Sequence, residues 1–123
     1  MSINKEKIYT ALSIFLLSSI FFLYFTGGKI FAIDNVEWLL PDDSKYHYLS
    51  WLFFQETPFF QFPIFDNPSF GMEFSSSLSL NDAIPVMALF FKIFNVFLPF
   101  ESQYFGLWIF ICFFLQAFFS FNL

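Results

Sequence analysis

The stretch IYTALSIFLLSSIFFLYF, from Ile8 to Phe25, contains no charged side chain. As an α-helix it would be about 27 Å long, at about 1.5 Å per residue, close to the roughly 30 Å of a bilayer hydrocarbon core. Two lysines precede it, and two glycines follow it where a helix would end. The sequence therefore predicts a short cytoplasmic start and a first transmembrane helix within residues 1–25.

A secretory signal peptide is the competing interpretation, because it also joins a basic start to an apolar run. Signal peptides usually have apolar runs of about 7–15 residues, and TGGKIFAID after the run lacks a small-x-small cleavage pattern. We therefore favour an uncleaved helix. Lys5 and Lys7 place the N-terminus in the cytoplasm by the positive-inside rule, so residues 26–82 are expected outside.

Composition agrees with a lipid environment. Of 123 residues, 58% are hydrophobic, 25 are Phe and only 12% are charged, against roughly 25% in soluble domains. Such a chain cannot cover itself with a wettable surface, so membrane lipids are expected partners. The five basic residues are scattered singly, which excludes a nucleic-acid-binding patch. With one cysteine, Cys112, no internal disulfide is possible.

The outer segment, residues 26–82, is acidic and interrupted by prolines. Within it, residues 44–56 are expected to form an amphipathic helix at the membrane surface that begins after two aspartates and ends before Pro58. One helix face would carry Asp43, His47, Ser50, Trp51 and Phe54, and the other Tyr48, Leu49, Leu52 and Phe53. Residues 58–80 are expected to form an ordered loop, with Gly71 at positive φ.

Two further apolar segments follow. Residues 83–99 predict a helix of about 17 residues, capped by Asn81 or Asp82 and carrying Pro85 in its first turn. Lys92 disfavours a lipid-facing span, so a juxtamembrane or re-entrant helix with this lysine at the headgroups is favoured, although a crossing stays open.

Residues 103–123 predict a second transmembrane helix, which the end of the sequence would truncate. The expected fold is thus an all-α membrane protein. It would have two to three membrane-embedded helices and an outer loop with short juxtamembrane helices. So few segments enclose little core, which favours a fragment of a larger bundle that contains the remaining helices of a longer chain.

The carboxylates of the outer segment allow two interpretations. Asp42 and Asp43 could provide a general base or bind a divalent metal, or could simply cap the helix that follows. His47 lies one helical turn after Asp43, which permits an Asp–His pair. Asp82 has the same ambiguity at the start of the next helix. No set of metal ligands is assigned, so the cofactor stays unknown, with a divalent metal as one option.

Aromatic side chains of the same segment also have two interpretations. They fit an interfacial belt, or they could line a groove for a lipid or a sugar ring. The residues concerned include Trp38, Tyr46, Tyr48 and Trp51.

Three blocks of sequence resemble a known architecture: WLLPDDSKYHYLSWLFFQETPFFQFP (residues 38–63), SSLSLNDAIPVMALFFKIF (76–94) and SQYFGLWIFICFFLQ (102–116). In this order they resemble a bacterial membrane-protein family of unassigned function that is thought to share the architecture of GT-C polytopic glycosyltransferases. The resemblance covers roughly residues 36–116. In GT-C enzymes the first outer loop carries an essential Asp near the end of the first helix, and the donor is a polyprenyl-phosphate-linked sugar.

Carried over residue by residue, Asp43 matches the Asp four residues before the family's His, which is His47 here. The resemblance implies that Asp43 is the general base and that Asp82 is a second acidic residue. Asp42 stands where Gly is more frequent, and Gln55 stands where Arg often follows the two aromatics. The substrate-binding set would then be Asp42, Tyr46 and Trp51.

The resemblance implies the N-terminal portion of a glycosyltransferase at the outer face of the bacterial inner membrane, in a multi-pass chain. One alternative is a non-enzymatic multi-pass protein for lipid or polymer transport, with its acids as helix caps. Another is an inactive truncated fragment.

Overall fold

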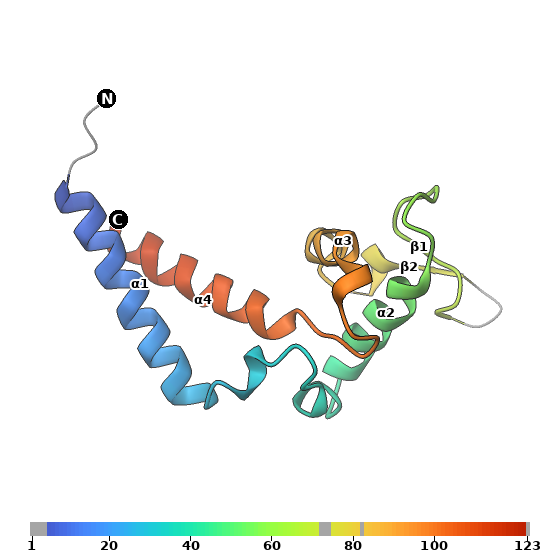
Figure 1. Ribbon diagram of the computed structural model, residues 1–123, viewed down its shortest axis with the longest axis horizontal. Helices are drawn as coiled ribbons and strands as arrows, with labels where there is room; N and C mark the ends of the chain where they lie inside the picture. The colour runs from blue at the N-terminus through green and yellow to red at the C-terminus, as the bar shows by residue number, and fades with distance from the viewer. Residues whose placement is uncertain (1–4, 72–74, 82, 123) are drawn as a thin grey trace. The chain divides into compact units, whose positions relative to one another are not determined.

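The structure is a computed structural model that describes residues 5–71, 75–81 and 83–122, and the described part is mostly helical (Figure 1). The chain divides into two compact units. We call residues 1–32 with 105–123 the helix-pair unit, and residues 33–104 the central unit.

The helix-pair unit is built from α1 (Lys5–Thr26), the short 3₁₀ helix η1 (Lys29–Phe31) and α4 (Phe105–Asn122). The two long helices pack through aromatic rings that meet edge to face. Phe15 lies 5.4 Å from Phe114 and Phe22 lies 5.3 Å from Phe110, between ring centroids. This geometry is the favoured one for aromatic pairs.

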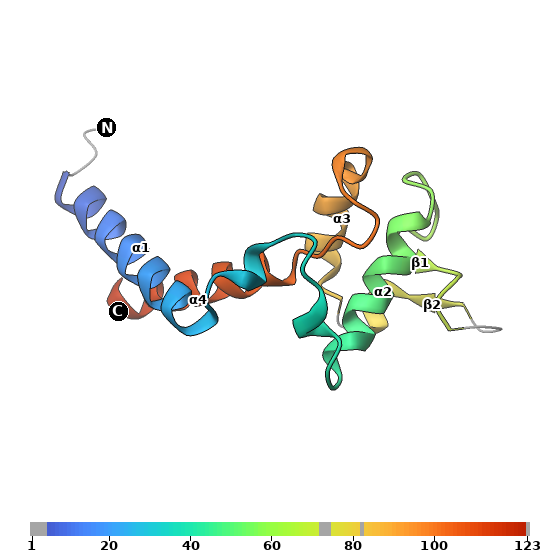
Figure 2. The same ribbon diagram turned by 60° about the horizontal axis from the view of Figure 1, so that its bottom comes forward.

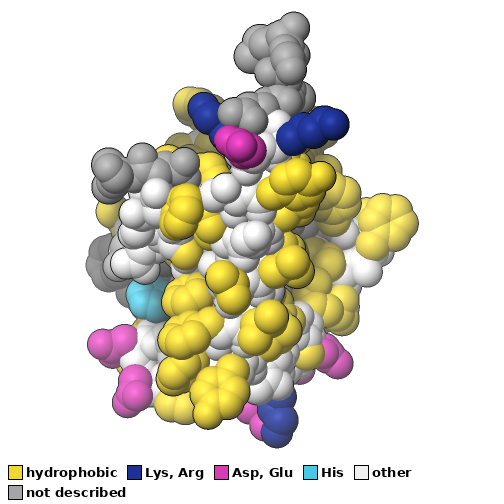
Figure 3. All heavy atoms as spheres, turned by 90° about the vertical axis from the view of Figure 1, so that its left-hand side faces the viewer, with side chains coloured by type: hydrophobic (Ala, Val, Ile, Leu, Met, Phe, Trp, Pro, Cys, Tyr) yellow, Lys and Arg dark blue, Asp and Glu magenta, His cyan; other side chains and the backbone are white. Residues whose placement is uncertain are grey.

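Within the described residues, one helix, α1, is long and apolar enough to cross a membrane by length and composition. Figure 3 shows hydrophobic side chains spread along its outer face, with acidic and basic side chains at the end near the N-terminus. The apolar part of α4, residues 105–121, is slightly shorter than such a span requires.

The chain turns sharply after α1, as the two glycines predicted. Gly27 and Gly28 have φ angles of 65° and 72°, in the left-handed region that glycine tolerates. The Gly27 N–H donates to the Leu23 carbonyl at 2.9 Å, which completes the last turn of the helix. The chain that leaves this turn then passes close to Gly106 of α4, where a Cβ would lie 1.8 Å from the Ile30 carbonyl oxygen.

The central unit is organised around α2 (Ser44–Glu56), which occupies the residues expected for it. Around it lie η2 (Glu37–Leu39), η3 (Leu78–Leu80), α3 (Pro85–Ile93), η4 (Asn95–Phe97) and a pair of short strands (Figure 2). The buried face of α2 consists of Tyr48, Ser50, Trp51, Phe54 and Gln55. Tyr48 therefore shares a face with Trp51, because residues three apart are neighbours on a helix, and its expected place on the opposite face was wrong.

Residues 99–102 are fastened along this buried face by three side-chain donors of α2. The Tyr48 hydroxyl donates to the Glu101 carbonyl at 3.2 Å. The Trp51 Nε1–H donates to the Ser102 carbonyl at 2.8 Å, and the Gln55 amide donates to the Pro99 carbonyl at 3.3 Å. One hydrogen bond joins the two ends of the central unit: the Gln103 N–H donates to the Ile33 carbonyl at 2.8 Å.

Two short strands, β1 (Asp66–Asn67) and β2 (Ser76–Ser77), pair antiparallel with Asp66 opposite Ser77. The expected all-α fold is corrected in this detail. The pair is anchored to α2 because the buried Asn67 amide donates to the Ser50 carbonyl at 2.8 Å. Gly71, between the strands, has a φ of 108°, as predicted.

The helix expected over residues 83–99 is much shorter. It begins with Pro85, ends at Ile93, and continues after Phe94 only as a 3₁₀ turn. Its N-cap is Ile84 rather than Asn81 or Asp82. Nine residues rise about 14 Å, so α3 is too short to cross a bilayer as a helix.

Lys92 does not extend toward headgroups as expected. Its side chain is only 5% exposed, donates a hydrogen bond to Thr57 Oγ1, and lies 3.8 Å from the centre of the Phe54 ring. The ring face attracts the ammonium, while burial disfavours its charge. Burial prevails and lowers the pKa of Lys92 to about 8.

This buried lysine predicts a rise in stability with pH. The folded-state pKa of about 8 lies below the ordinary 10.5, so between these values the unfolded chain binds more protons. The free energy of unfolding should rise across this window by on the order of 3 kcal/mol. Denaturant unfolding of the full chain in detergent micelles at several pH values measures it.

The matched control is Lys92→Met, which keeps an unbranched side chain in the core. The free energy of unfolding of this variant should not rise with pH across the same window. Thr57 Oγ1 stays paired in this variant, because it also donates to the Phe54 carbonyl at 2.9 Å. Burial and, secondarily, the charge of Glu101 raise the pKa of Tyr48, so this group opposes the trend only above pH 10. Equal pH dependence in both proteins would contradict the prediction.

Candidate functional site

Two exposed carboxylates stand at the start of α2. Asp42 has a φ of 56°, a left-handed conformation that Asp tolerates better than most residues. Asp43 occupies the N-cap position, but its side chain makes no capping hydrogen bond. The Ser44 hydroxyl instead donates to the Pro41 carbonyl at 2.6 Å. The Asp43 carboxylate therefore projects into solvent next to a helix N-terminus, where a negative charge is favourable.

His47, one turn into α2, is held from a distant part of the chain. Its Nδ1 lies 2.9 Å from the Asn81 carbonyl oxygen. A carbonyl oxygen can only accept, so Nδ1 carries the proton and donates. In the neutral ring the basic nitrogen is then Nε2, and the ring orientation is fixed by the bond on its other side. The imidazole is half-buried and retains access to the surface.

Asn81 itself is firmly placed. Its side-chain amide donates to Ser76 Oγ at 2.9 Å and to the Ser77 carbonyl at 3.0 Å. The first turn of α2 is thus connected to the segment that leads directly to Asp82, although the two are far apart in sequence. Asp82 lies outside the described residues, so its side chain is not placed.

The two aromatic residues assigned to substrate binding differ in position. Tyr46 is exposed, and the Lys45 ammonium lies 5.2 Å from its ring centre. Trp51 is 0% exposed and stacks edge to face on Tyr104, with the ring centres 5.0 Å apart. Trp51 therefore belongs to the core of the central unit, and its assignment as a substrate-binding residue is corrected.

Metal ligands are not grouped within the described residues, where no three His, Cys, Asp or Glu side chains lie close enough to hold an ion. This statement does not cover Asp82, which lies outside the described residues. The described site thus consists of Asp43 and His47 with their neighbours Asp42 and Tyr46.

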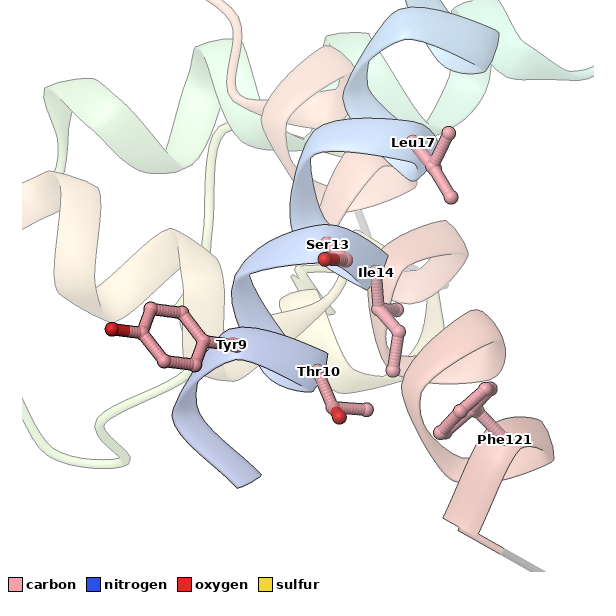
Figure 4. Close-up of a pocket in the computed structure, with 6 residues that line it drawn as sticks. All are labelled: Tyr9, Thr10, Ser13, Ile14, Leu17 and Phe121. Carbon is pink, nitrogen blue, oxygen red and sulfur yellow. The ribbon is translucent and has the colours of Figure 1, made fainter. Parts of the chain in front are cut away.

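A hollow of 310 Å³ in the helix-pair unit contains none of these residues. It lies between α1 and the end of α4, where Figure 4 shows the side chains that line it. They are Tyr9, Thr10, Ser13, Ile14, Leu17 and Phe121. None of them is charged, so the hollow offers no group for acid–base chemistry.

A family match covers residues 15–123, which includes the whole central unit, residues 15–32 and 105–123 of the helix-pair unit, and all of the site residues. The chain belongs to the family described as a domain of unknown function, DUF6311. No curated protein and no solved structure matches the chain. Membership of this family assigns no reaction.

The sequence did not reveal what holds His47. Its partner is a backbone carbonyl, which every residue possesses, so no residue type marks the position. Asn81 stood out in the sequence only as a possible cap, and its actual role is to orient the imidazole. The likewise unpredicted donors Tyr48 and Gln55 fasten the core behind the site.

Proposed function

We propose that this chain is the N-terminal portion of a membrane glycosyltransferase that takes a lipid-linked sugar donor at the outer face of the bacterial inner membrane. The observation that carries the proposal is the His47–Asn81 hydrogen bond. It joins the helix turn that presents Asp43 to Asn81, the residue that precedes Asp82 in the sequence. This supports the two acidic positions that the GT-C resemblance implies.

The membrane placement in the proposal is multi-pass, with the N-terminus in the cytoplasm. It draws on the length and apolar surface of α1 and on the aromatic packing of α4 along it. In this arrangement α1 crosses the bilayer with the apolar helix α4 packed along it, and residues 26–82 lie on the outer side. The remaining helices of a longer chain would complete the bundle.

The proposed reaction assigns separate roles to Asp43 and His47. The acceptor hydroxyl oxygen bonds to the anomeric carbon of the sugar as the bond from that carbon to the phosphate oxygen breaks. The electron pair leaves with the lipid phosphate, and the acceptor proton passes to the Asp43 carboxylate. His47, fixed through Nδ1, offers Nε2 to a sugar or acceptor hydroxyl. Cationic groups would stabilise the leaving phosphate.

The test is Asp43→Asn in the full-length protein. Loss of a positioned general base should reduce transfer by about 10²–10⁴-fold, while the amount of protein in the membrane stays unchanged. The assay follows a labelled sugar from a polyprenyl-phosphate-linked donor to acceptor in isolated membranes.

The control is Asp34→Asn, which removes an exposed carboxylate of the central unit that has no role in the proposed reaction. It should retain most of the transfer activity. If Asp43→Asn and Asp43→Ser both behave like wild type, Asp43 has only a structural role at the start of the helix, and the assignment of the base fails.

A further inference from the structure

Two uncharged loops of the central unit present large apolar side chains to solvent. Residues 57–65 read TPFFQFPIF and residues 93–100 read IFNVFLPF, without a single charge. The first follows α2 and the second contains η4. We call residues 59–64 and 94–100 together the aromatic tip.

Hydrogen bonds join the end of α2, where the first loop begins, to the second loop and to Lys92 just before it. The Asn95 amide donates to the Gln55 carbonyl at 3.0 Å, and Lys92 donates to Thr57 Oγ1. The Gln55 amide in turn reaches the Pro99 carbonyl. The bases of both halves of the aromatic tip are therefore anchored at the same end of α2.

Four side chains of the aromatic tip are almost fully exposed: Phe60 93%, Phe62 98%, Val96 91% and Phe97 85%. Burial of apolar surface contributes about 25 cal/mol per Å². Moving these side chains out of water would therefore release a large amount of free energy. Clustered exposed apolar side chains mark an interaction surface. Of the four charged residues that flank the two loops, Lys92 is buried, and the other three are acidic: Glu56, Asp66 and Glu101.

We propose that the aromatic tip inserts into the interfacial region of a lipid bilayer. This rests on the membrane placement of α1 in the proposed function. Only residues 27–32 separate the end of α1 from the central unit, so the chain can reach at most about 25 Å from the helix end. The bilayer that holds α1 is thus within reach of the unit that carries the tip.

The chemistry of the tip specifies how it binds lipid. It carries no basic residue, so attraction to anionic headgroups contributes nothing, and its acidic border disfavours them. Insertion is driven by Phe and Val burial to a depth of about 5–10 Å below the headgroups. A zwitterionic lipid surface is therefore the ligand.

Spin labels on single cysteines test the inference in the full chain with Cys112→Ser as background, reconstituted in phosphatidylcholine vesicles. Labels replace Phe60 and Phe97 in the tip. The control label replaces Leu80, which is 79% exposed but lies next to Asn81, the partner of His47 near the opposite end of α2. A label at Leu16, an exposed position of α1, reports whether this helix lies in the bilayer.

Collision rates with oxygen, which concentrates in lipid, and with a water-soluble nickel complex are measured for each label. The inference expects labels at 60 and 97 to favour oxygen, at a depth of about 5–10 Å, while the label at 80 favours nickel. Added phosphatidylglycerol should not increase the depth.

Two results would overturn the inference. Nickel access at 60 and 97 would place the tip in water, and exclusion of both reagents would show that protein covers it. The label at Leu16 separates these results from failure of the membrane placement. If it favours oxygen while the tip labels favour nickel, only the inference about the tip falls.

Discussion

Replacing Trp51 with alanine is expected to lower the free energy of unfolding by about 3–5 kcal/mol, the usual cost of removing a large buried aromatic side chain. Trp51 is completely buried at the centre of α2, and its ring packs on Tyr104. Its Nε1–H also holds the Ser102 carbonyl, which would lose that partner. Denaturant unfolding of the full chain in micelles, followed by circular dichroism, gives the value.

Two further variants separate packing from hydrogen bonding. Trp51→Phe keeps an aromatic ring but loses the bond to Ser102, and should cost about 1–3 kcal/mol. Trp38→Ala removes a half-buried tryptophan whose Nε1–H donates to the Asn35 carbonyl at 3.1 Å, and should cost less than Trp51→Ala. An equal or larger loss at Trp38 would contradict the central position of Trp51 in the core.

Gly106→Ala is expected to disrupt the contact between α4 and the turn after α1. The added methyl group would lie 1.8 Å from the Ile30 carbonyl oxygen and 2.7 Å from its carbon, so the backbone itself must move. Overpacking of this kind costs about 1–3 kcal/mol or more, which exceeds the roughly 1 kcal/mol that alanine returns in helix propensity. The midpoint of thermal unfolding should fall, and crosslinking between cysteines placed on α1 and α4 should weaken.

Gly27→Ala is the matched control, because nothing lies within 4 Å of the added methyl group. Because φ at this position is 65°, the alanine adds about 1–2 kcal/mol of backbone strain. The substitution leaves the contact of α4 with the turn intact. Gly27→Ala should therefore lower stability without changing the crosslinking. If Gly106→Ala leaves both readouts unchanged, the close approach at Ile30 is wrong.

The parts of the fold that the sequence predicted are those that local chemistry decides. Pro58 ends α2, and the glycine pair ends α1, because each residue type restricts its own backbone. The two-residue strands could not be foreseen, since no periodicity develops over so short a length. Their register depends on distant partners such as Ser50.

Lys92 illustrates why the rest could not be predicted. A lysine in an apolar segment is expected to reach water, and only tertiary structure supplies the Phe54 ring and the Thr57 hydroxyl that accommodate it. The Asn95 amide bonds to the Gln55 carbonyl just after α3 has ended, another tertiary contact that the sequence does not mark. For the site, the sequence shows the spacing of Asp43 and His47, but it does not indicate the hydrogen bond from His47 to the Asn81 carbonyl.

The bond between Gln103 and Ile33 has a consequence for how such chains diversify. Because the central unit begins and ends at neighbouring points, it is an insertion whose two ends meet, attached to Ala32 and Phe105. A segment of this kind can be lengthened, shortened or exchanged for another without stretching the helices on either side. A short bridge from Ala32 to Phe105 should therefore yield a minimal helical hairpin in which Gly106 still lies against Ile30.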